Sequence, residues 1–168
     1  MSGSSDSTAG DVVFRKIKPE HYEMLSSFLE ENNLPVVVRT FNPFPMTEET
    51  ARKIALAPRR DHYYGAFLAA RIVGLSMLRG WNEGYSVPSF GIIVDHSFHN
   101  RGIGARMTEF TVEEARKLGC ARVRLTVYAS NHAAVRIYAA KGFVECGREP
   151  VLLMGAPDER IVMLKELS

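Results

Sequence analysis

The chain has 168 residues, of which 46% are hydrophobic and 24% are charged. This length suits one compact core and is too short for two ordinary domains. The 21 basic and 19 acidic residues give a net charge of +2, and the basic residues are dispersed along the chain. No broad electrostatic surface for nucleic acid or for a membrane is therefore implied.

The first residues and the cysteines say little about function. Residues 1–10 are rich in Ser and Gly and lack the apolar segment of a signal peptide, so we expect a disordered tail followed by a single domain over residues 11–168. No run reaches the ~18 apolar residues of a membrane span. Cys120 and Cys146 indicate no disulfide framework. Cytoplasmic localisation is the default expectation.

The first half of the chain predicts two helices and four strands. The expected strand over 12–17 is followed by helices over 19–31 and 47–57, and then by strands over 62–70, 71–81 and 86–94. Turn residues at 70–71 and 82–84 join the last three strands into an antiparallel meander. Between the two helices, residues 36–45 contain two prolines and two phenylalanines and predict a stiff, aromatic loop.

In the second half, strands and helices alternate. The patterns predict a helix over 104–118, a strand over 123–127, a helix over 131–141, and final strands over 143–148 and 160–165. A strand, a helix and a strand in succession favour a parallel, right-handed crossover. We therefore expect an α/β fold with a mixed sheet.

The segment from Val94 to Ala105 is the most informative local pattern. The end of a buried strand is followed by a short loop, by Gly102 and Gly104, and by a helix. The first turn of a helix has free N–H groups and a partial positive charge, and glycines leave room for an oxyanion. Arg101 can add a charged contact. The pattern predicts a pyrophosphate site. A turn that needs glycine only for its conformation is the alternative.

A second pattern follows one strand later. Asn131 and Tyr138 are seven residues apart and share one helix face. In this order and spacing, the two patterns resemble the GNAT superfamily of acyl-CoA N-acyltransferases. The family's first motif, Gln/Arg-x-x-Gly-x-Gly/Ala, is matched by residues 99–104, with His99 standing where Gln or Arg is usual. Its second motif, Asn-x-x-Ala-x-x-x-Tyr followed by Gly-Phe, is matched by Asn131, Ala134, Tyr138, Gly142 and Phe143.

The resemblance implies a GNAT-type three-layer α/β fold. Its central sheet is mixed, mostly antiparallel and splayed between the fourth and fifth strands, and acetyl-CoA is the co-substrate that enters the gap. The pantetheine would pair with the strand backbone at 92–94, and the pyrophosphate would lie on the loop and helix start. The implied cofactor-binding residues are Ile92, Ile93, Val94, His99, Asn100, Arg101, Gly102, Ile103, Gly104, Ala105, Asn131, Ala134 and Tyr138.

The resemblance also implies direct attack of an amine on the thioester. Backbone N–H groups near Ile93 and Val94 would stabilise the oxyanion, and Tyr138 would act as general acid toward the leaving thiolate. An isolated tyrosine at this spacing would be read as a core residue. Some family members use a glutamate on the strand before the loop, but residues 86–94 contain no acid. Glu83 and His96 are the candidates for the general base, directly or through water.

No metal site is expected, because His96 and His99 are a thin ligand set and no cysteine cluster accompanies them. For the acceptor, the resemblance implies walls from residues 39–45 and 148–158. An aromatic and polar surface suits sugars and drug-like amines, although its aromatic residues can equally fill the core. The candidate substrate-binding residues are Arg39, Phe41, Asn42, Phe44, Trp81 and Tyr85.

The expected function is acetyl transfer from acetyl-CoA to the primary amine of a small molecule, such as an amino sugar or an antibiotic-like amine. Two alternatives stay open. One is a protein or peptide N-acetyltransferase with the same fold, and the other is a non-catalytic acyl-CoA-binding sensor. The sequence does not decide the oligomeric state, and a homodimer is one of the assemblies it allows.

Overall fold

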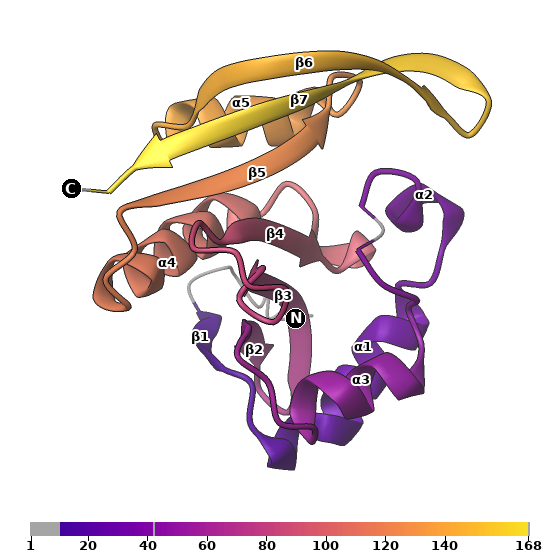
Figure 1. Ribbon diagram of the computed structural model, residues 1–168. Coiled ribbons are helices and arrows are strands. Elements are labelled where there is room, and N and C mark those ends of the chain that lie inside the picture. Colours follow the sequence, from indigo (N-terminus) through magenta and orange to yellow (C-terminus); the bar gives the residue numbers. More distant parts are fainter. Residues whose placement is uncertain (1–10, 42, 168) are drawn as a thin grey trace, which may run out of the picture.

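The computed structural model describes residues 11–41 and 43–167, so the predicted tail over 1–10 lies outside the described residues. Seven strands form one sheet in the order β1-β2-β3-β4-β5-β7-β6 (Figure 1). Neighbouring strands are antiparallel except for β4 and β5, which are parallel. The prediction of a mixed, mostly antiparallel sheet in an α/β fold is confirmed. The strands are β1 (Val13–Lys16), β2 (His62–Leu68), β3 (Arg71–Arg79), β4 (Ser89–Val94), β5 (Arg122–Tyr128), β6 (Val144–Leu153) and β7 (Ala156–Glu166).

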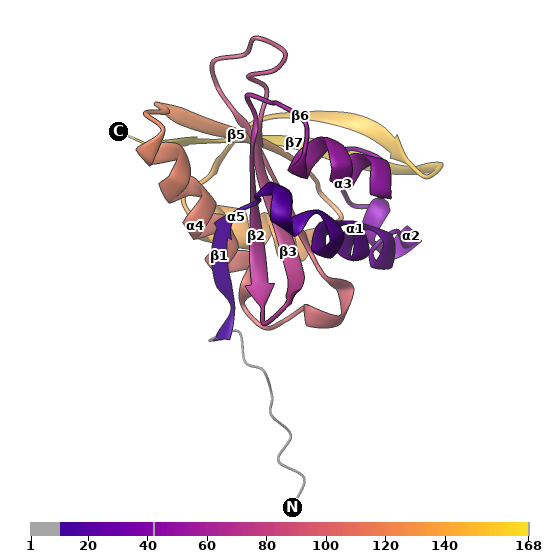
Figure 2. The same cartoon turned by 90° about the horizontal axis from the view of Figure 1, so that it is seen from below.

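Helices cover both faces of the sheet. On one side of β2 and β3 lie α1 (Tyr22–Glu31) and α3 (Glu48–Ala55), and on the other side lies α4 (Ile103–Lys117) (Figure 2). The remaining helices are α2 (Pro35–Val38) and α5 (His132–Ala140), and α5 packs behind the β5–β7 half. Each helix buries an apolar side against the sheet, which gives three layers. No helix within the described residues is both long and apolar enough to cross a bilayer.

The sheet parts between β4 and β5. These two strands share a single register pair, Ser89 with Arg124, next to a hydrogen bond of 3.0 Å from the Arg124 N–H to the Pro88 carbonyl. By contrast, β5 pairs with β7 along its whole length from Arg122 to Tyr128. Beyond Ser89, the edge of β4 that faces β5 therefore has no neighbouring strand. The predicted splay between the fourth and fifth strands is confirmed.

Most predicted elements lie within a few residues of their observed bounds, and two regions differ. Residues 36–45 were expected to form only a loop, but Pro35–Val38 forms one helical turn. Pro35 has the fixed φ of a first helical residue, and the buried side chain of Val37 ties the turn to the core beside α1 and α3. The last hairpin is also longer than expected, because β6 and β7 keep pairing to Leu153 and Ala156.

A buried ionic junction fastens the segment after β4 to the end of α1. The Asp95 carboxylate is fully buried and accepts hydrogen bonds from Arg71 Nη2 at 3.1 Å, Asn32 Nδ2 at 3.2 Å and the Ser97 N–H at 2.9 Å. Asn32 in turn accepts a hydrogen bond of 3.0 Å from the His96 N–H. Burial opposes ionisation of Asp95, but the hydrogen bonds from Ser97 and Asn32 and the charge of Arg71 outweigh it, so the pKa of Asp95 lies below its ordinary value.

We expect Asp95→Ala to lower the free energy of unfolding by about 3 kcal/mol, because it leaves buried donors without an acceptor. Urea unfolding at pH 7 measures the change. Glu31→Ala is the matched control, since Glu31 is the other, half-exposed carboxylate on Arg71, at 3.3 Å. That exposed pair contributes about 1 kcal/mol or less. Equal losses in the two variants would contradict the assignment of the junction to Asp95.

The same junction predicts a pH dependence. A carboxylate with a depressed folded-state pKa contributes stability that is fully present above its unfolded pKa of about 3.9 and is lost as pH falls through the folded pKa. The difference in stability between the wild type and Asp95→Ala should therefore be constant from neutral pH down to about pH 5 and shrink in stronger acid. A difference that stays constant down to pH 2 would contradict the depressed pKa.

Candidate active site

The gap between β4 and β5 holds a cavity of about 380 Å³ on the side of α4 and α5, which we call the helix-side cavity. Its walls are β4, the start of α4, part of β5 and one face of α5. All the predicted cofactor-binding residues except Arg101 line it, and so do several that the sequence did not single out. Those additional residues include Phe90, Gly91, Phe98, Thr108, Thr126, Val127, Ala133 and Ile137.

The start of α4 has the geometry that the sequence predicted. Gly102 has a φ of +76° and stands at the N-cap of α4, and Asn100 has a φ of +62°. These left-handed residues turn the chain sharply, so that the first amides of α4 border the cavity. Gly104 lies inside the helix and needs no unusual φ. In a helix the first N–H groups have no intrahelical acceptor, so a negatively charged group is the natural partner here.

The backbone of β4 presents alternate residues to the gap. The Asp95 N–H donates to the Val73 carbonyl on β3. In an antiparallel pair the backbone groups of every second residue point to the same neighbour, so the N–H and C=O groups of Ile93 also point toward β3. The N–H groups of Ile92 and Val94 therefore point toward β5. The contact of 3.3 Å between His99 Nε2 and the Val94 carbonyl agrees with this direction. Of the two residues predicted near the oxyanion, Val94 has its amide on the cavity side.

Tyr138 lies on α5 at the wall of the helix-side cavity, with 7% of its surface exposed. Its ring packs edge-on against Phe90 and Phe143, with centroids 5.8 and 6.0 Å away. Burial raises the pKa of the Tyr138 phenol, so the hydroxyl stays protonated at neutral pH. The side chain is therefore a core residue that also lines the cavity with its hydroxyl protonated.

Three other residues of the two motifs have distinct positions. Asn131 caps α5, since its side-chain oxygen accepts the Ala134 N–H at 3.3 Å, and it also lines the cavity. His99 is exposed at the cavity edge. Arg101 does not line the cavity, and its guanidinium lies 4.9 Å from the centre of the Phe98 ring.

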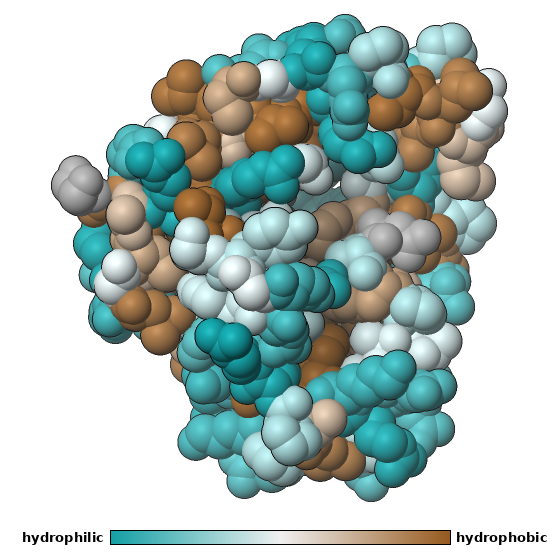
Figure 3. All heavy atoms as spheres, viewed as in Figure 1, coloured by the Kyte–Doolittle hydropathy of each residue, from teal (hydrophilic) through white to brown (hydrophobic). Residues whose placement is uncertain are grey.

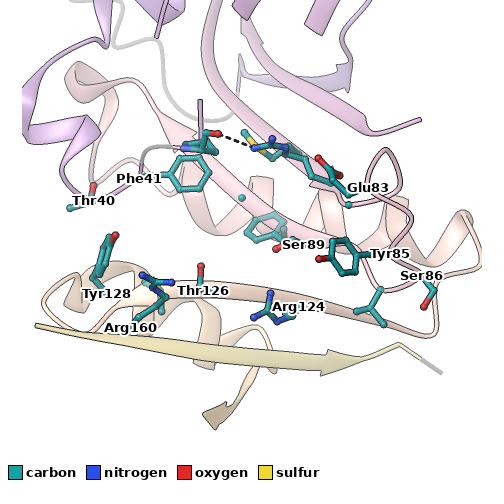
Figure 4. Close-up of a pocket in the computed structure, with 18 residues that line it drawn as sticks. Thr40, Phe41, Glu83, Tyr85, Ser86, Ser89, Arg124, Thr126, Tyr128 and Arg160 are labelled. Atoms are coloured by element: carbon teal, nitrogen blue, oxygen red, sulfur yellow. Dashed lines mark hydrogen bonds between the residues drawn. The ribbon is translucent and has the colours of Figure 1, made fainter. Parts of the chain in front are cut away.

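A second cavity of about 770 Å³ opens on the opposite side of the gap, and we call it the loop-side cavity. The space-filling view shows the surface hollowed between the half with β5, β6 and β7 and the half below it (Figure 3). The close-up shows side chains of β5 and β7 on one side of this cavity, and Thr40, Phe41 and the 80–87 loop on the other (Figure 4). The two cavities share six lining residues, Thr40, Phe41, Phe90, Gly91, Thr126 and Val127.

Phe41 stands where the two cavities meet. A side chain on Gly91 would collide with it, because a Cβ placed on Gly91 would lie 2.5 Å from Phe41 Cζ. Gly91 therefore lets the tip of the Phe41 ring come close to β4. Of the predicted acceptor residues, Phe41 and Tyr85 line the loop-side cavity.

The other predicted acceptor residues lie elsewhere. Phe44 packs on the core beside α1 and α3, and Trp81 packs on the other core cluster with its ring edge-on to His62 at 5.3 Å. Arg39 is exposed and lines neither cavity, and Asn42 lies outside the described residues. The stretch over 148–158 contributes no described residue to the loop-side lining. For Phe44 and Trp81, the interpretation as core residues fits the structure.

The two candidate bases are separated by the fold. Glu83 lines the loop-side cavity from the 80–87 loop (Figure 4). His96 lies beyond the end of β4, where its ring is 3.3 Å from Asn32 Oδ1 and 3.7 Å from Asp95, and it lines neither cavity. The structure brings Glu83 to the loop-side cavity and leaves His96 in the junction with α1.

The sequence reading missed the polar wall of the loop-side cavity. Arg124, Thr126 and Tyr128 project from one face of β5, and Arg160 projects beside them from β7, where it pairs in register with Tyr128. The alternation along β5 was available as a signal, because buried Val123, Leu125 and Val127 alternate with these polar residues. The alternation predicts a strand, but it does not indicate what the polar face of that strand meets.

Comparisons with known proteins agree with this geometry. The family model described as the acetyltransferase (GNAT) family matches residues 21–143, which is more than half of the chain. A curated relative, the ribosomal protein bS18-alanine N-acetyltransferase of Escherichia coli, is 34% identical over 79 residues. That match covers 40% of this chain and 53% of the relative, so the chain spans about half the length of the curated relatives it matches.

Solved structures of similar shape cover almost the whole chain. A spermidine N-acetyltransferase from Vibrio cholerae, solved with CoA and spermine, has a TM-score of 0.77 at 18% identity and covers 94% of this chain and 96% of its own. A GCN5-related N-acetyltransferase from Kribbella flavida has a TM-score of 0.78 at 19% identity, with 95% and 100% covered. At these identities the likeness concerns the fold. With the family match over residues 21–143, the chain belongs to the acetyltransferase (GNAT) family.

Proposed function

We propose that the helix-side cavity binds acetyl-CoA, with the diphosphate on the first amides of α4 and the pantetheine along β4. Two observations support this placement. The amides at the start of α4 have no intrahelical acceptor and border the cavity beside Gly102. The cavity-side amides of Ile92 and Val94 lie where the sheet has parted, so an amide-containing chain can pair with them as a missing strand would.

The acceptor amine would enter from the opposite side. The single observation that carries this proposal is the shared wall of the two cavities, formed by Phe41, Gly91, Thr126 and their neighbours. A thioester at this wall is reachable from the loop-side cavity without crossing the sheet. Holding the amine and the thioester on opposite sides of one gap supplies most of the rate through proximity.

In the proposed mechanism the amine attacks the thioester carbonyl directly. The Val94 N–H stabilises the oxyanion that forms, and the Tyr138 hydroxyl donates its proton to the departing sulfur. Glu83 receives the proton of the incoming ammonium, directly or through water, since it is the carboxylate that the described structure places in the loop-side lining. Acetyl-CoA supplies the activated acetyl group, and the chain supplies position, the oxyanion donor and the proton donor.

We further propose that the acceptor is the primary amine of a small molecule. The loop-side cavity is walled on one side by Thr40, Phe41 and the 80–87 loop and on the other by β5 and β7, which suits a compact ligand (Figure 4). The alternative acceptor is a peptide N-terminus, and the similarity to the ribosomal protein bS18-alanine N-acetyltransferase favours it. The third alternative, a sensor that binds acetyl-CoA without turnover, leaves the Tyr138 hydroxyl without a role.

An amine panel separates the three alternatives. Release of CoA thiol from acetyl-CoA is followed with amino sugars, other small amines and short peptides. Turnover with small amines at a kcat/KM at least tenfold above that with peptides supports the proposal. The reverse order supports the peptide acetyltransferase. Binding of acetyl-CoA with thiol release at background for every amine supports the sensor.

The diphosphate placement predicts different effects for the two glycines of the first motif. Gly102→Ala forces a non-glycine residue to a φ of +76°, which costs about 1 kcal/mol, and we expect it to weaken acetyl-CoA binding roughly fivefold by shifting the first amides of α4. Isothermal titration measures the affinity. Gly104→Ala is the control, because its Cβ would lie 3.6 Å from Ile137 and 3.8 Å from Val94 in ordinary contact. Equal affinities in both variants and the wild type would contradict the placement.

The role of Tyr138 predicts a loss of turnover without a loss of binding. Tyr138→Phe keeps the ring packing and removes the proton donor, so we expect kcat to fall about 100-fold with little change in the KM for acetyl-CoA. Tyr64→Phe is the control, since Tyr64 is another buried tyrosine with a raised pKa and lies outside both cavity linings. If Tyr138→Phe turns over as fast as Tyr64→Phe, Tyr138 is a packing residue only.

A further inference from the structure

The loop-side cavity carries an excess of positive charge. Its described lining contains three arginines, Arg79, Arg124 and Arg160, and one acid, Glu83. The chain as a whole is nearly balanced, with 21 basic and 19 acidic residues, so the excess is local to this cavity. An enzyme for a polycationic amine would need the opposite charge here, because like charges repel at close range.

Two of the three arginines are already engaged by the protein. Arg79 donates to the Pro43 carbonyl at 3.3 Å and lies 5.7 Å from the centre of the Phe44 ring. Arg160 forms an ion pair of 3.3 Å with Glu149. For the Arg124 guanidinium, the described part of the chain supplies no carboxylate or carbonyl partner. The close-up shows the Arg124 side chain directed from β5 into the cavity, opposite Glu83 and Tyr85 (Figure 4).

The position of Arg124 sets the distance from the reacting centre. Thr126, which belongs to the wall shared by both cavities, comes two residues later on β5, roughly 7 Å along the strand. Arg124 is also the residue that pairs with Ser89, at the point where β4 and β5 part. A group bound by Arg124 and an amine at the shared wall therefore fit within one small molecule.

Guanidinium groups bind carboxylates and phosphates with two parallel hydrogen bonds. We propose that the acceptor of this enzyme is a small amine that also carries a carboxylate or a phosphate, and that Arg124 binds this anionic group. The inference rests on the proposed placement of the acceptor in the loop-side cavity. Ser89 and Thr126 flank Arg124 with hydroxyl groups, and Phe41 and Tyr85 supply aromatic walls for the body of the molecule.

Matched pairs of amines test the inference in the wild-type enzyme. The two members of each pair differ only by the anionic group: phenylalanine and phenethylamine, 6-aminohexanoate and pentylamine, and an amino sugar with and without a phosphate ester. Spermine serves as the polycationic probe. We expect the anionic member of at least one pair to have a kcat/KM about 10- to 100-fold above its neutral partner, and above spermine.

Variants assign the preference to Arg124. Arg124→Gln should raise the KM for the anionic amine on the order of 10-fold or more while the KM for acetyl-CoA stays constant, and Arg124→Lys should recover part of the loss. Arg122→Gln is the matched control, because Arg122 lies on the same strand, pairs with Glu166 at 3.6 Å and lies outside the cavity lining. We expect Arg122→Gln to keep the wild-type KM values for the anionic amine and for acetyl-CoA.

The outcomes separate two kinds of failure. If amines are acetylated but the anionic members have no advantage, or if Arg124→Gln and Arg122→Gln keep the same preference, the inference is wrong and the proposed function stands. If thiol release stays at background with every amine in the panel, the proposed acetylation of small amines is wrong and the inference falls with it.

Discussion

A β-strand inside a sheet must have partners for its backbone on both edges, and β4 has them on one edge only. Beyond the pair of Ser89 and Arg124, the backbone N–H and C=O groups on the edge of β4 that faces β5 have no partner strand, and their partner must be a molecule in the gap. Different helices pack on the two halves of the sheet. On one half lie α1 and α3, and on the other lies α5. The site depends on this parting.

The residues around the gap follow from that constraint. The crossover from β4 to β5 must pass through α4, so the positive end of α4 begins where β4 ends. The buried Asp95 fixes the first residues of the crossover to α1 through Asn32 and Arg71. On the other side, α5 follows β5 and carries Tyr138 to the same gap. The elements β4, α4 and α5 therefore all border the gap that β4 and β5 leave between them.

Much of this arrangement could be predicted from the sequence, because its determinants are local. Gly102 needs a left-handed φ, Thr47 caps α3 and Asn131 caps α5, and each of these is visible from the residue type and its neighbours. The two motifs indicated the family, and with it the parted sheet. These features do not depend on where the remote parts of the chain lie.

The acceptor side could not be predicted in the same way, because it depends on tertiary packing. Phe41, Phe44 and Trp81 are equally aromatic in the sequence and all three pack on the core, but of these only Phe41 also lines the cavities. The difference for Phe41 is Gly91, which lies 50 residues away and makes room for its ring. Arg124 and Arg160 lie on two different strands, and only the fold shows that both line one cavity.

The most direct measurement of the central claim is a crystal structure of the protein with CoA bound. The account predicts diphosphate oxygens within hydrogen-bond distance of the backbone nitrogens at the start of α4, and the thiol between β4 and β5 next to the Tyr138 hydroxyl. A diphosphate bound elsewhere, or a Tyr138 hydroxyl turned away from the sulfur, would contradict it.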